Sequence, residues 1–156
     1  MKNLIVDATR DKIFLTLIVD ENIYTCSHEN SKINFEKLMI LINDFLKVNS
    51  SSLDQIEVIY VNRGPGSFAG IRNSLATIKA LFLTKKINYY CFSFEDFKGF
   101  DEVKYEDVPS LCEKFKIKKN LINPIYLSLF IFFLLLLFVL LIINNVDISA
   151  LVNDIC

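Results

Sequence analysis

Three of the four glycines of the chain lie within one ten-residue stretch, RGPGSFAGIR at residues 63–72. It follows a run of β-forming residues and precedes a helical pattern, so its N–H groups would lie at a helix N-terminus, where anions bind. With Ser67 and Arg72 the loop could hold a phosphate. It matches neither common phosphate-binding motif, because Ile71-Arg72 replaces the Lys-Ser/Thr of a Walker A loop and Ala69 replaces a dinucleotide-loop glycine.

A structural role for this loop is the preferred interpretation. Pro65 would fix the entry into the turn, and Ser67 would cap the helix that follows. The residues to which we assign this role, with anion binding as the alternative, are Arg63, Gly64, Pro65, Gly66, Ser67, Gly70 and Arg72.

The other side chains that could take part in catalysis or metal binding have no suitably spaced partner residues in the sequence. His28, the single histidine, follows a predicted strand and could be a general base, but an isolated loop histidine is more often inert. Asp7 and Asp11 flank a turn, and no third carboxylate has a spacing that would complete a metal site, so we expect Asp7 to form the turn. We predict no catalytic residue and no metal ligand.

The four cysteines, Cys26, Cys91, Cys112 and Cys156, include no C-x-x-C pair, which argues against a zinc site. Cys26 and Cys91 lie within strand-like runs. We expect both to be small core residues.

The elements that must position these residues follow from hydrophobic patterning. Apolar residues recur at helical spacing in two segments, and the first helix should open near Ser31 or Asn34 and end by Asn49. Ser93 should cap a short helical segment over 94–97. The predicted strands cover 4–6, 13–19, 23–26, 56–61 and 89–92, and the predicted helices cover about 34–48 and 70–84.

The resulting order is β-β-β-α-β-α-β. Because crossover connections force parallel neighbours, this order predicts an α/β fold with a mixed five-stranded sheet, the topology of a ribonuclease-H-like lobe. Both helices carry more apolar residues than one sheet-facing stripe needs, so the surplus would meet the other helix or a partner protein. The candidate interface residues are Met39, Leu41, Ile42, Phe45, Leu75, Ile78 and Leu81.

The charge distribution separates the C-terminal part from the rest. With 17 Lys plus Arg against 18 Asp plus Glu, the net charge of −1 gives no basis for direct nucleic-acid binding. Residues 125–143 form a 19-residue run without charge, which predicts a transmembrane helix. Lysines precede this run at Lys114, Lys116, Lys118 and Lys119 and none follows it, so the positive-inside rule predicts a cytoplasmic domain tethered to the inner (plasma) membrane.

We expect four parts: a lobe over 1–98, a connector over 99–124, the span over 125–143 and a short tail over 144–156. The mixed charges of residues 101–107 favour a solvated loop within the connector. A cytoplasmic protein without a membrane tether is the alternative.

The loop at 63–72 closely resembles the corresponding loop of the TsaB (YeaZ) family. Supporting similarities are Ile5-Val6-Asp7-Ala8-Thr9 to the family's first strand, Cys91-Phe92-Ser93-Phe94-Glu95, and Asn123-Pro124-Ile125-Tyr126-Leu127 to its closing Pro-x-Tyr-Leu. The resemblance covers residues 1 to about 98 well and 120–127 faintly.

This resemblance implies a noncatalytic scaffold subunit with the actin-like ATPase fold. Such proteins pair with the larger paralogue TsaD, which transfers a threonylcarbamoyl group to an adenosine of tRNAs, and with the small ATPase TsaE. The helices corresponding to 34–48 and 70–84 would form the pairing surface, which family homodimers also use, and Arg72 is a candidate contact. ATP or ADP would bind only in the complex, and tRNA only indirectly.

Two departures from the family pattern leave alternatives open. Only about 25 residues separate Lys98 from the Pro-x-Tyr-Leu-like segment, so we expect 99–124 to be a shortened remnant of a second lobe, without an interlobe cleft. The apolar run is the other departure. The alternatives are a degenerate actin-like nucleotide-binding protein that uses Asp7, Ser67 and Arg72, or a membrane-anchored interaction module without a tRNA role.

Overall fold

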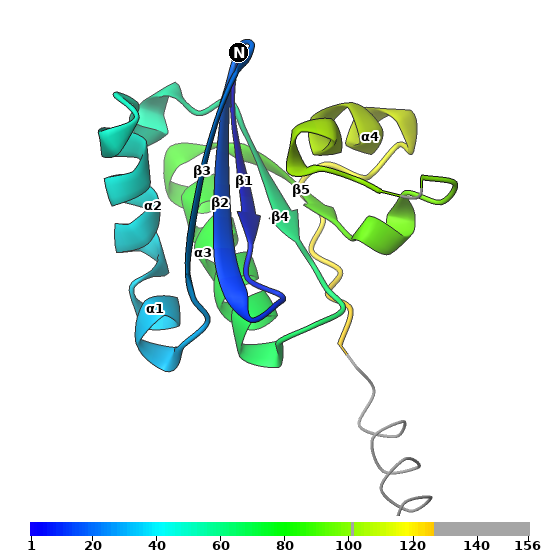
Figure 1. The fold of residues 1–156 in the computed structure, drawn as a ribbon, viewed down its shortest axis with the longest axis horizontal. Coiled ribbons are helices and arrows are strands. Elements are labelled where there is room, and N and C mark those ends of the chain that lie inside the picture. The colour runs from blue at the N-terminus through cyan, green and yellow to red at the C-terminus, as the bar shows by residue number, and fades with distance from the viewer. Residues whose placement is uncertain (101, 127–156) are drawn as a thin grey trace, which may run out of the picture. The chain divides into compact units, whose positions relative to one another are not determined.

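Five strands form one mixed sheet in the order β3-β2-β1-β4-β5 (Figure 1). β1 pairs antiparallel with β2 and parallel with β4, and β4 pairs parallel with β5. The structure is a computed structural model that describes residues 1–100 and 102–126. The predicted strand and helix order is confirmed, and the strands are β1 (Lys2–Asp7), β2 (Lys12–Val19), β3 (Asn22–Glu29), β4 (Val58–Asn62) and β5 (Asn88–Phe92).

The helices cover both faces of the sheet. In Figure 1, α1 and α2 lie on one side of the strands and α4 lies on the other. The α-helices are α1 (Lys32–Glu36), α2 (Leu38–Val48), α3 (Phe68–Lys85) and α4 (Val108–Lys114), and the 3₁₀ turns are η1 (Leu53–Gln55), η2 (Phe94–Asp96) and η3 (Tyr105–Asp107).

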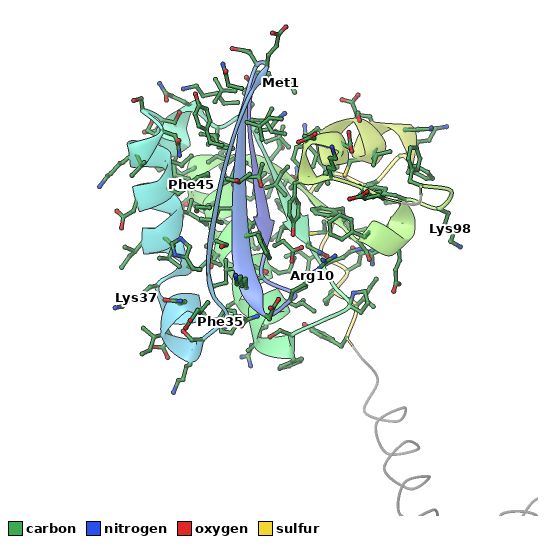
Figure 2. All side chains as sticks on the ribbon, viewed as in Figure 1. Met1, Arg10, Phe35, Lys37, Phe45 and Lys98 are labelled. Atoms are coloured by element: carbon green, nitrogen blue, oxygen red, sulfur yellow. The ribbon has the colours of Figure 1, made fainter. Side chains whose placement is uncertain are left out.

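The first predicted helix is interrupted at Lys37. Ser31 caps α1 by accepting a hydrogen bond from the Asn34 N–H, as expected, but Lys37 leaves helical geometry before α2 begins. Phe35 on α1 approaches Gly70 at the start of α3, while Phe45 on α2 packs farther along the same side of the sheet (Figure 2).

The core between the sheet and α1, α2 and α3 is mostly aliphatic. Alternate residues of β1 and β2 point into it, and every second side chain of a strand must face the same side. Its fully buried members include Leu4, Val6, Leu15, Leu17, Leu38, Ile42, Ile59 and Ile71.

The opposite face of the sheet has its own core, which the sequence did not predict. Residues 102–107 expose their charged side chains as expected, but η3 and α4 then fold back onto β1, β4 and β5. Residues 103–117 therefore contribute to the core on this face of the sheet, and Met1–Tyr126 form one unit. The buried members of this second core are Ile5, Tyr60, Phe92, Phe97, Val108, Leu111 and Cys112.

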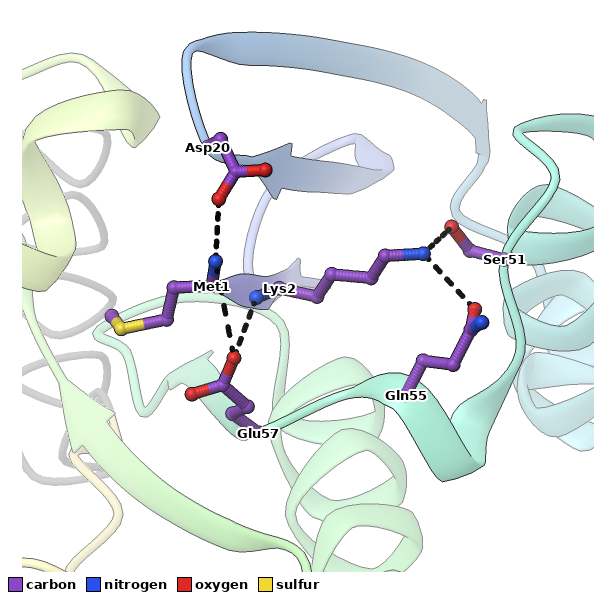
Figure 3. Close-up of polar contacts among 6 residues, drawn as sticks. All are labelled: Met1, Lys2, Asp20, Ser51, Gln55 and Glu57. Atoms are coloured by element: carbon purple, nitrogen blue, oxygen red, sulfur yellow. Dashed lines mark hydrogen bonds and ion pairs between the residues drawn. The ribbon is translucent and has the colours of Figure 1, made fainter.

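The start of β1 is fixed by polar contacts with three neighbouring segments (Figure 3). The Lys2 Nζ donates to Ser51 Oγ at 3.1 Å and to Gln55 Oε1 at 3.0 Å, and its backbone N–H donates to Glu57 Oε1 at 3.2 Å. The Met1 amine lies 2.5 Å from Asp20 Oδ1. This hydrogen bond raises the pKa of the amine and lowers the pKa of Asp20. The pair is solvent-exposed, so it contributes little to stability.

The predicted membrane span over 125–143 and the tail over 144–156 lie outside the described residues, apart from Ile125 and Tyr126. Within residues 1–100 and 102–126, none of the helices has both the length and the apolar composition that crossing a membrane requires.

Candidate functional site

Polar side chains gather where the parallel strands β1 and β4 end. Asp7, the last residue of β1, is fully buried, and its carboxylate accepts four hydrogen bonds. Oδ1 accepts from the Thr9 N–H at 2.9 Å and the Thr9 hydroxyl at 2.7 Å. Oδ2 accepts from Asn62 Nδ2 at 2.9 Å and the Tyr105 hydroxyl at 2.8 Å. The predicted turn-forming role of Asp7 is confirmed, and these donors balance the cost of burying the carboxylate.

Asn62 connects this carboxylate to the glycine loop. Its Nδ2 donates to Asp7, and its Oδ1 accepts the Gly64 N–H at 3.0 Å. Gly64 has a φ of +106°, a conformation that favours glycine, and a Cβ there would overlap the carbonyl of Ile125.

The glycine loop itself lies against the turn between β1 and β2. The Ser67 N–H donates to the Thr9 carbonyl at 2.7 Å, and the Ser67 hydroxyl accepts the Gly70 N–H at 3.2 Å, capping α3 as predicted. A Cβ at Gly70 would overlap the carbonyl oxygen of Ala8. The glycine loop thus packs backbone against backbone, which explains why glycine is needed.

Arg63, the first residue of the loop, is held on two sides. Its Nη2 lies 2.5 Å from Asp96 Oδ1 on η2, and its Nη1 donates to the Asn123 carbonyl at 3.0 Å. Its backbone carbonyl accepts the Ile125 N–H at 2.8 Å. Arg63 therefore joins the loop to η2 and to residues 123–125.

Two small cavities flank Arg10, which lies at the end of the sheet where β1 stops (Figure 2). One, of about 190 Å³, is lined by Thr9, Asn62, the loop and the segment after β5, where Ser93 caps η2 as predicted. The other, of about 360 Å³, lies between β2, β3 and η3. The Arg10 guanidinium stacks over the Phe94 ring at 5.3 Å between them.

The three residues proposed for phosphate binding are not brought together as a set. Asp7 is saturated by internal donors, and the Ser67 hydroxyl caps α3. Arg72 is exposed on α3 and makes no hydrogen bond or ion pair with the described residues. The Tyr105 hydroxyl, which reaches Asp7, has its pKa raised by burial and then by the Asp7 charge, so it stays a donor at neutral pH.

A second concave region lies between α2 and α3. This groove has a volume of about 660 Å³, and the Lys85–Asp54 ion pair, with 2.9 Å between Nζ and Oδ1, lies at its rim. Its lining residues are Met39, Asn43, Ser52, Leu53, Asp54, Thr77, Ala80, Leu81, Thr84 and Lys85.

Only some of the seven residues predicted to form the partner interface line this groove. Most of those side chains point into the core beneath the helices, because the same stripe that could meet a partner is needed to cover the sheet. Only Met39 and Leu41 are partly exposed, and of the whole set Met39 and Leu81 line the groove. The residues buried in the core are Ile42, Phe45, Leu75, Ile78 and Leu81.

His28 lies within β3 and not after a strand, so its predicted position was wrong. Its Nε2 is 3.6 Å from Cys26 Sγ. Among residues 1–100 and 102–126, no three His, Cys, Asp or Glu side chains are arranged to hold a metal ion. Burial raises the pKa of the Cys91 and Cys112 thiols to about 12, and it also raises that of the half-buried Cys26. The prediction of Cys91 as a core residue is confirmed.

Sequence reasoning missed Asn62 and Tyr105, both bound to Asp7. Asn62 could have been found, because it ends a buried parallel strand beside the one that Asp7 ends, and such ends meet at one edge of a sheet. For Tyr105, which is 98 residues from Asp7 in a charged segment, the sequence offers no local pattern.

Part of the chain is similar in sequence to known proteins. Residues 29–93 match the family model described as TsaD: tRNA N6-adenosine threonylcarbamoyltransferase. The chain is 35% identical to the tRNA threonylcarbamoyladenosine biosynthesis protein TsaB of Buchnera aphidicola subsp. Baizongia pistaciae (strain Bp), over 43% of this chain and 36% of that relative. The match thus spans little more than a third of that relative's length.

Two solved structures share the fold. One is YeaZ from Pseudomonas aeruginosa, and the other is described as an uncharacterized protein with similarity to peptidase YEAZ from the same organism. Each matches this chain with a TM-score of 0.55 and 18% identity. The match covers 59% of this chain and 43% of the solved chain. At this identity they establish the fold alone. Part of the chain is thus similar in sequence to a TsaD family model and to a TsaB protein, and its fold is similar to that of YeaZ.

Proposed function

We propose that this chain is a noncatalytic subunit in the formation of threonylcarbamoyladenosine in tRNA, and that it pairs with a TsaD-like transferase through α2 and α3. The name of the TsaB relative supports the process. A TsaE-like ATPase and tRNA would meet the chain through that transferase, and ATP or ADP would bind only in the assembly.

The saturation of Asp7 carries the noncatalytic part of the proposal. A carboxylate that accepts four internal hydrogen bonds has no lone pair turned toward a ligand. The glycine loop also supports a noncatalytic role. The Gly64 N–H donates a hydrogen bond to Asn62 Oδ1, and the Gly70 N–H donates one to Ser67 Oγ. A loop whose N–H groups are used in this way stabilises the turn instead of binding phosphate.

The groove between α2 and α3 supports the pairing part. It combines apolar groups from Met39, Leu53 and Leu81 with the Asp54–Lys85 ion pair at the rim. An apolar centre with a polar rim is the usual arrangement of protein interfaces.

Co-purification with a TsaD-like protein tests the pairing. We expect Ala80→Glu, which places a charge in the groove, to abolish the association. Leu83→Glu is the matched control, because Leu83 is 58% exposed on the same helix and does not line the groove. Equal recovery of the transferase with both variants would refute the proposed surface.

The nucleotide-binding alternative makes a different prediction. If Asp7, Ser67 and Arg72 bound phosphates, the isolated chain would bind ATP, and Arg72→Ala would weaken that binding. We expect isothermal titration of the full chain with ATP to show no saturable binding up to about 1 mM, a range that covers ordinary substrate affinities. Micromolar binding that depends on Arg72 would favour the enzyme alternative.

A further inference from the structure

Residues 114–126 combine positive charge with exposed apolar side chains. The segment contains four lysines and neither aspartate nor glutamate. It follows α4 and passes β5 (Figure 1), where Lys119 forms a β-bridge with Tyr90. Asn120 Oδ1 also accepts the Tyr89 N–H at 2.9 Å. The segment is therefore held against the sheet, and its side chains form a defined surface.

The lysines of this segment have no acidic partners in the part of the chain that the structure describes. Lys116, Lys118 and Lys119 are exposed, and none of them forms an ion pair there. Lys114 lies over the exposed ring of Phe100, with 4.8 Å between Nζ and the ring centroid. These positive charges are therefore available to an external anionic partner.

A hollow of about 290 Å³ brings charged and apolar groups of this surface together. Arg63, Lys116 and Lys118 line it, with Asp96 as its one acidic side chain. Because Arg63 and Asp96 pair with each other, the two lysines give the hollow its excess positive charge. Leu121, which is 44% exposed, lines the same hollow. Positive and apolar side chains thus lie next to each other.

Large apolar side chains continue along the chain beyond this hollow. Ile122 is exposed, and Tyr126 is 41% exposed. The Tyr126 ring contacts that of Phe68, which is also exposed, with the two centroids 4.8 Å apart. Directly after Tyr126, residues 127–143 contain no charged residue. Aromatic residues such as tyrosine are enriched where proteins pass from water into lipid.

We propose that residues 114–126 dock on the surface of a bilayer that contains anionic phospholipids. Lys116 and Lys118 would lie among the lipid phosphates, and Leu121 and Ile122 would enter the outer part of the acyl-chain region. Each lysine near an anionic bilayer strengthens binding by about fivefold. This surface shares no residue with the α2–α3 groove, so the inference goes beyond the proposed function and does not depend on it.

The apolar side chains favour lipid over nucleic acid as the anionic partner. RNA would also supply phosphates for the lysines, but proteins bind its bases by stacking and hydrogen bonding, and Leu121 and Ile122 can do neither. A bilayer presents phosphates and hydrocarbon within about 5–10 Å of each other, which matches lysines beside exposed leucine and isoleucine. The predicted membrane span directly after this segment supports the same choice, because lysine clusters beside spans bind anionic lipids.

A tryptophan at position 121 tests the docking. The chain contains no tryptophan, so Leu121→Trp introduces a single fluorophore. The full chain is reconstituted in phosphatidylcholine vesicles with brominated acyl chains, with or without about 30% phosphatidylglycerol. Relative to vesicles without bromine, we expect about half or more of the fluorescence to be quenched in the anionic vesicles and less than about a fifth in phosphatidylcholine alone.

The position control is Val48→Trp, because Val48 is 83% exposed on α2 and lies outside the surface. It should stay unquenched in both kinds of vesicle. A membrane span alone would bring position 121 equally close to both lipids, so equal quenching in both would refute the docking surface. Quenching no stronger than that of Val48→Trp, or failure of the chain to associate with the anionic vesicles, would also refute it.

Removing lysines tests the source of the attraction. In the Leu121→Trp background, Lys116→Ala with Lys118→Ala should weaken docking about 30-fold and reduce the quenching to the level seen in phosphatidylcholine. Lys32→Ala with Lys47→Ala removes two exposed lysines from α1 and α2 and should leave the quenching unchanged.

Thermal melting checks that each of these variants is folded. Equal quenching with both lysine pairs would overturn the proposal. It would also be overturned if added tRNA changed the emission of Leu121→Trp and anionic vesicles did not, because the lysines would then serve nucleic acid.

Discussion

On the face of the sheet that α1, α2 and α3 cover, the buried side chains are almost all aliphatic. On the face that η2, η3 and α4 cover, aromatic rings make up a larger share of the core, with the ring centroids of Phe92 and Phe97 6.0 Å apart and those of Phe97 and Phe115 5.8 Å apart. The first face consists of long elements with a repeating pattern. The second face is held by a few large rings on short segments. Each ring therefore contributes more to stability, and hydrophobic periodicity predicts these segments less well.

The largest expected effect tests whether the unpredicted face contributes as much stability as the predicted one. Phe92→Ala removes a fully buried ring and should lower the free energy of unfolding by about 4 kcal/mol. Leu46→Ala on the helix face should cost about 3 kcal/mol. Urea unfolding of both variants measures this, and a cost below about 1 kcal/mol for Phe92→Ala would mean that the second face is only loosely attached.

The next prediction concerns the contact between α3 and the turn after β1. Gly70→Ala forces a Cβ into the Ala8 carbonyl oxygen and should cost about 3 kcal/mol in urea unfolding. Gly99→Ala is the control, because nothing lies within 4 Å of its Cβ and only its φ of +89° opposes the change. It should cost about 1 kcal/mol, and equal losses would contradict the backbone packing.

A smaller effect should come from the hydrogen bond that joins the two regions. Tyr105→Phe keeps the ring but removes the donor to Asp7 Oδ2, which should cost about 2 kcal/mol, as for other hydrogen bonds to charged groups. Thermal or urea unfolding gives the value. Tyr24→Phe is the matched control on the exposed edge strand and should change stability by less than about 0.5 kcal/mol.

The smallest effect is a pH dependence shared by both faces. The thiols of Cys91 in the first core and Cys112 in the second have folded pKa values of about 12, above that of an unfolded cysteine. The unfolded state therefore releases these protons first, so their contribution is intact below about pH 8 and is lost as pH rises toward 12.

Between about pH 8 and pH 9 we expect a loss on the order of 1 kcal/mol in urea unfolding. Cys91→Ala and Cys112→Ala should each remove about half of this slope. If Cys112→Ala left the pH dependence of the free energy of unfolding unchanged, the Cys112 thiol would be accessible to solvent in the folded protein. The second core would then differ from the first in the burial of its thiol.

These differences explain what the sequence could predict. The stripe of Leu38, Ile42 and Phe45 identifies a sheet-covering helix, and Ser67 and Ser93 identify helix starts, because capping and periodicity act over a few residues. α4 has only seven residues and η3 has three, too few for a periodic pattern. The hydrogen bond from Tyr105 to Asp7 could not be predicted, because the two residues are 98 positions apart and no local sequence pattern links them.

The link between Tyr105 and Asp7 also bears on how the protein is made. During synthesis, β1 to β5 and the helices between them leave the ribosome before Tyr105 does, so the aliphatic side can assemble while Asp7 still lacks one donor. Domains generally fold in this order, from the N-terminus, as the chain emerges. The nascent chain would then expose the aromatic side of its sheet until residues 105–114 arrive, and that interval is when a chaperone would have most to bind.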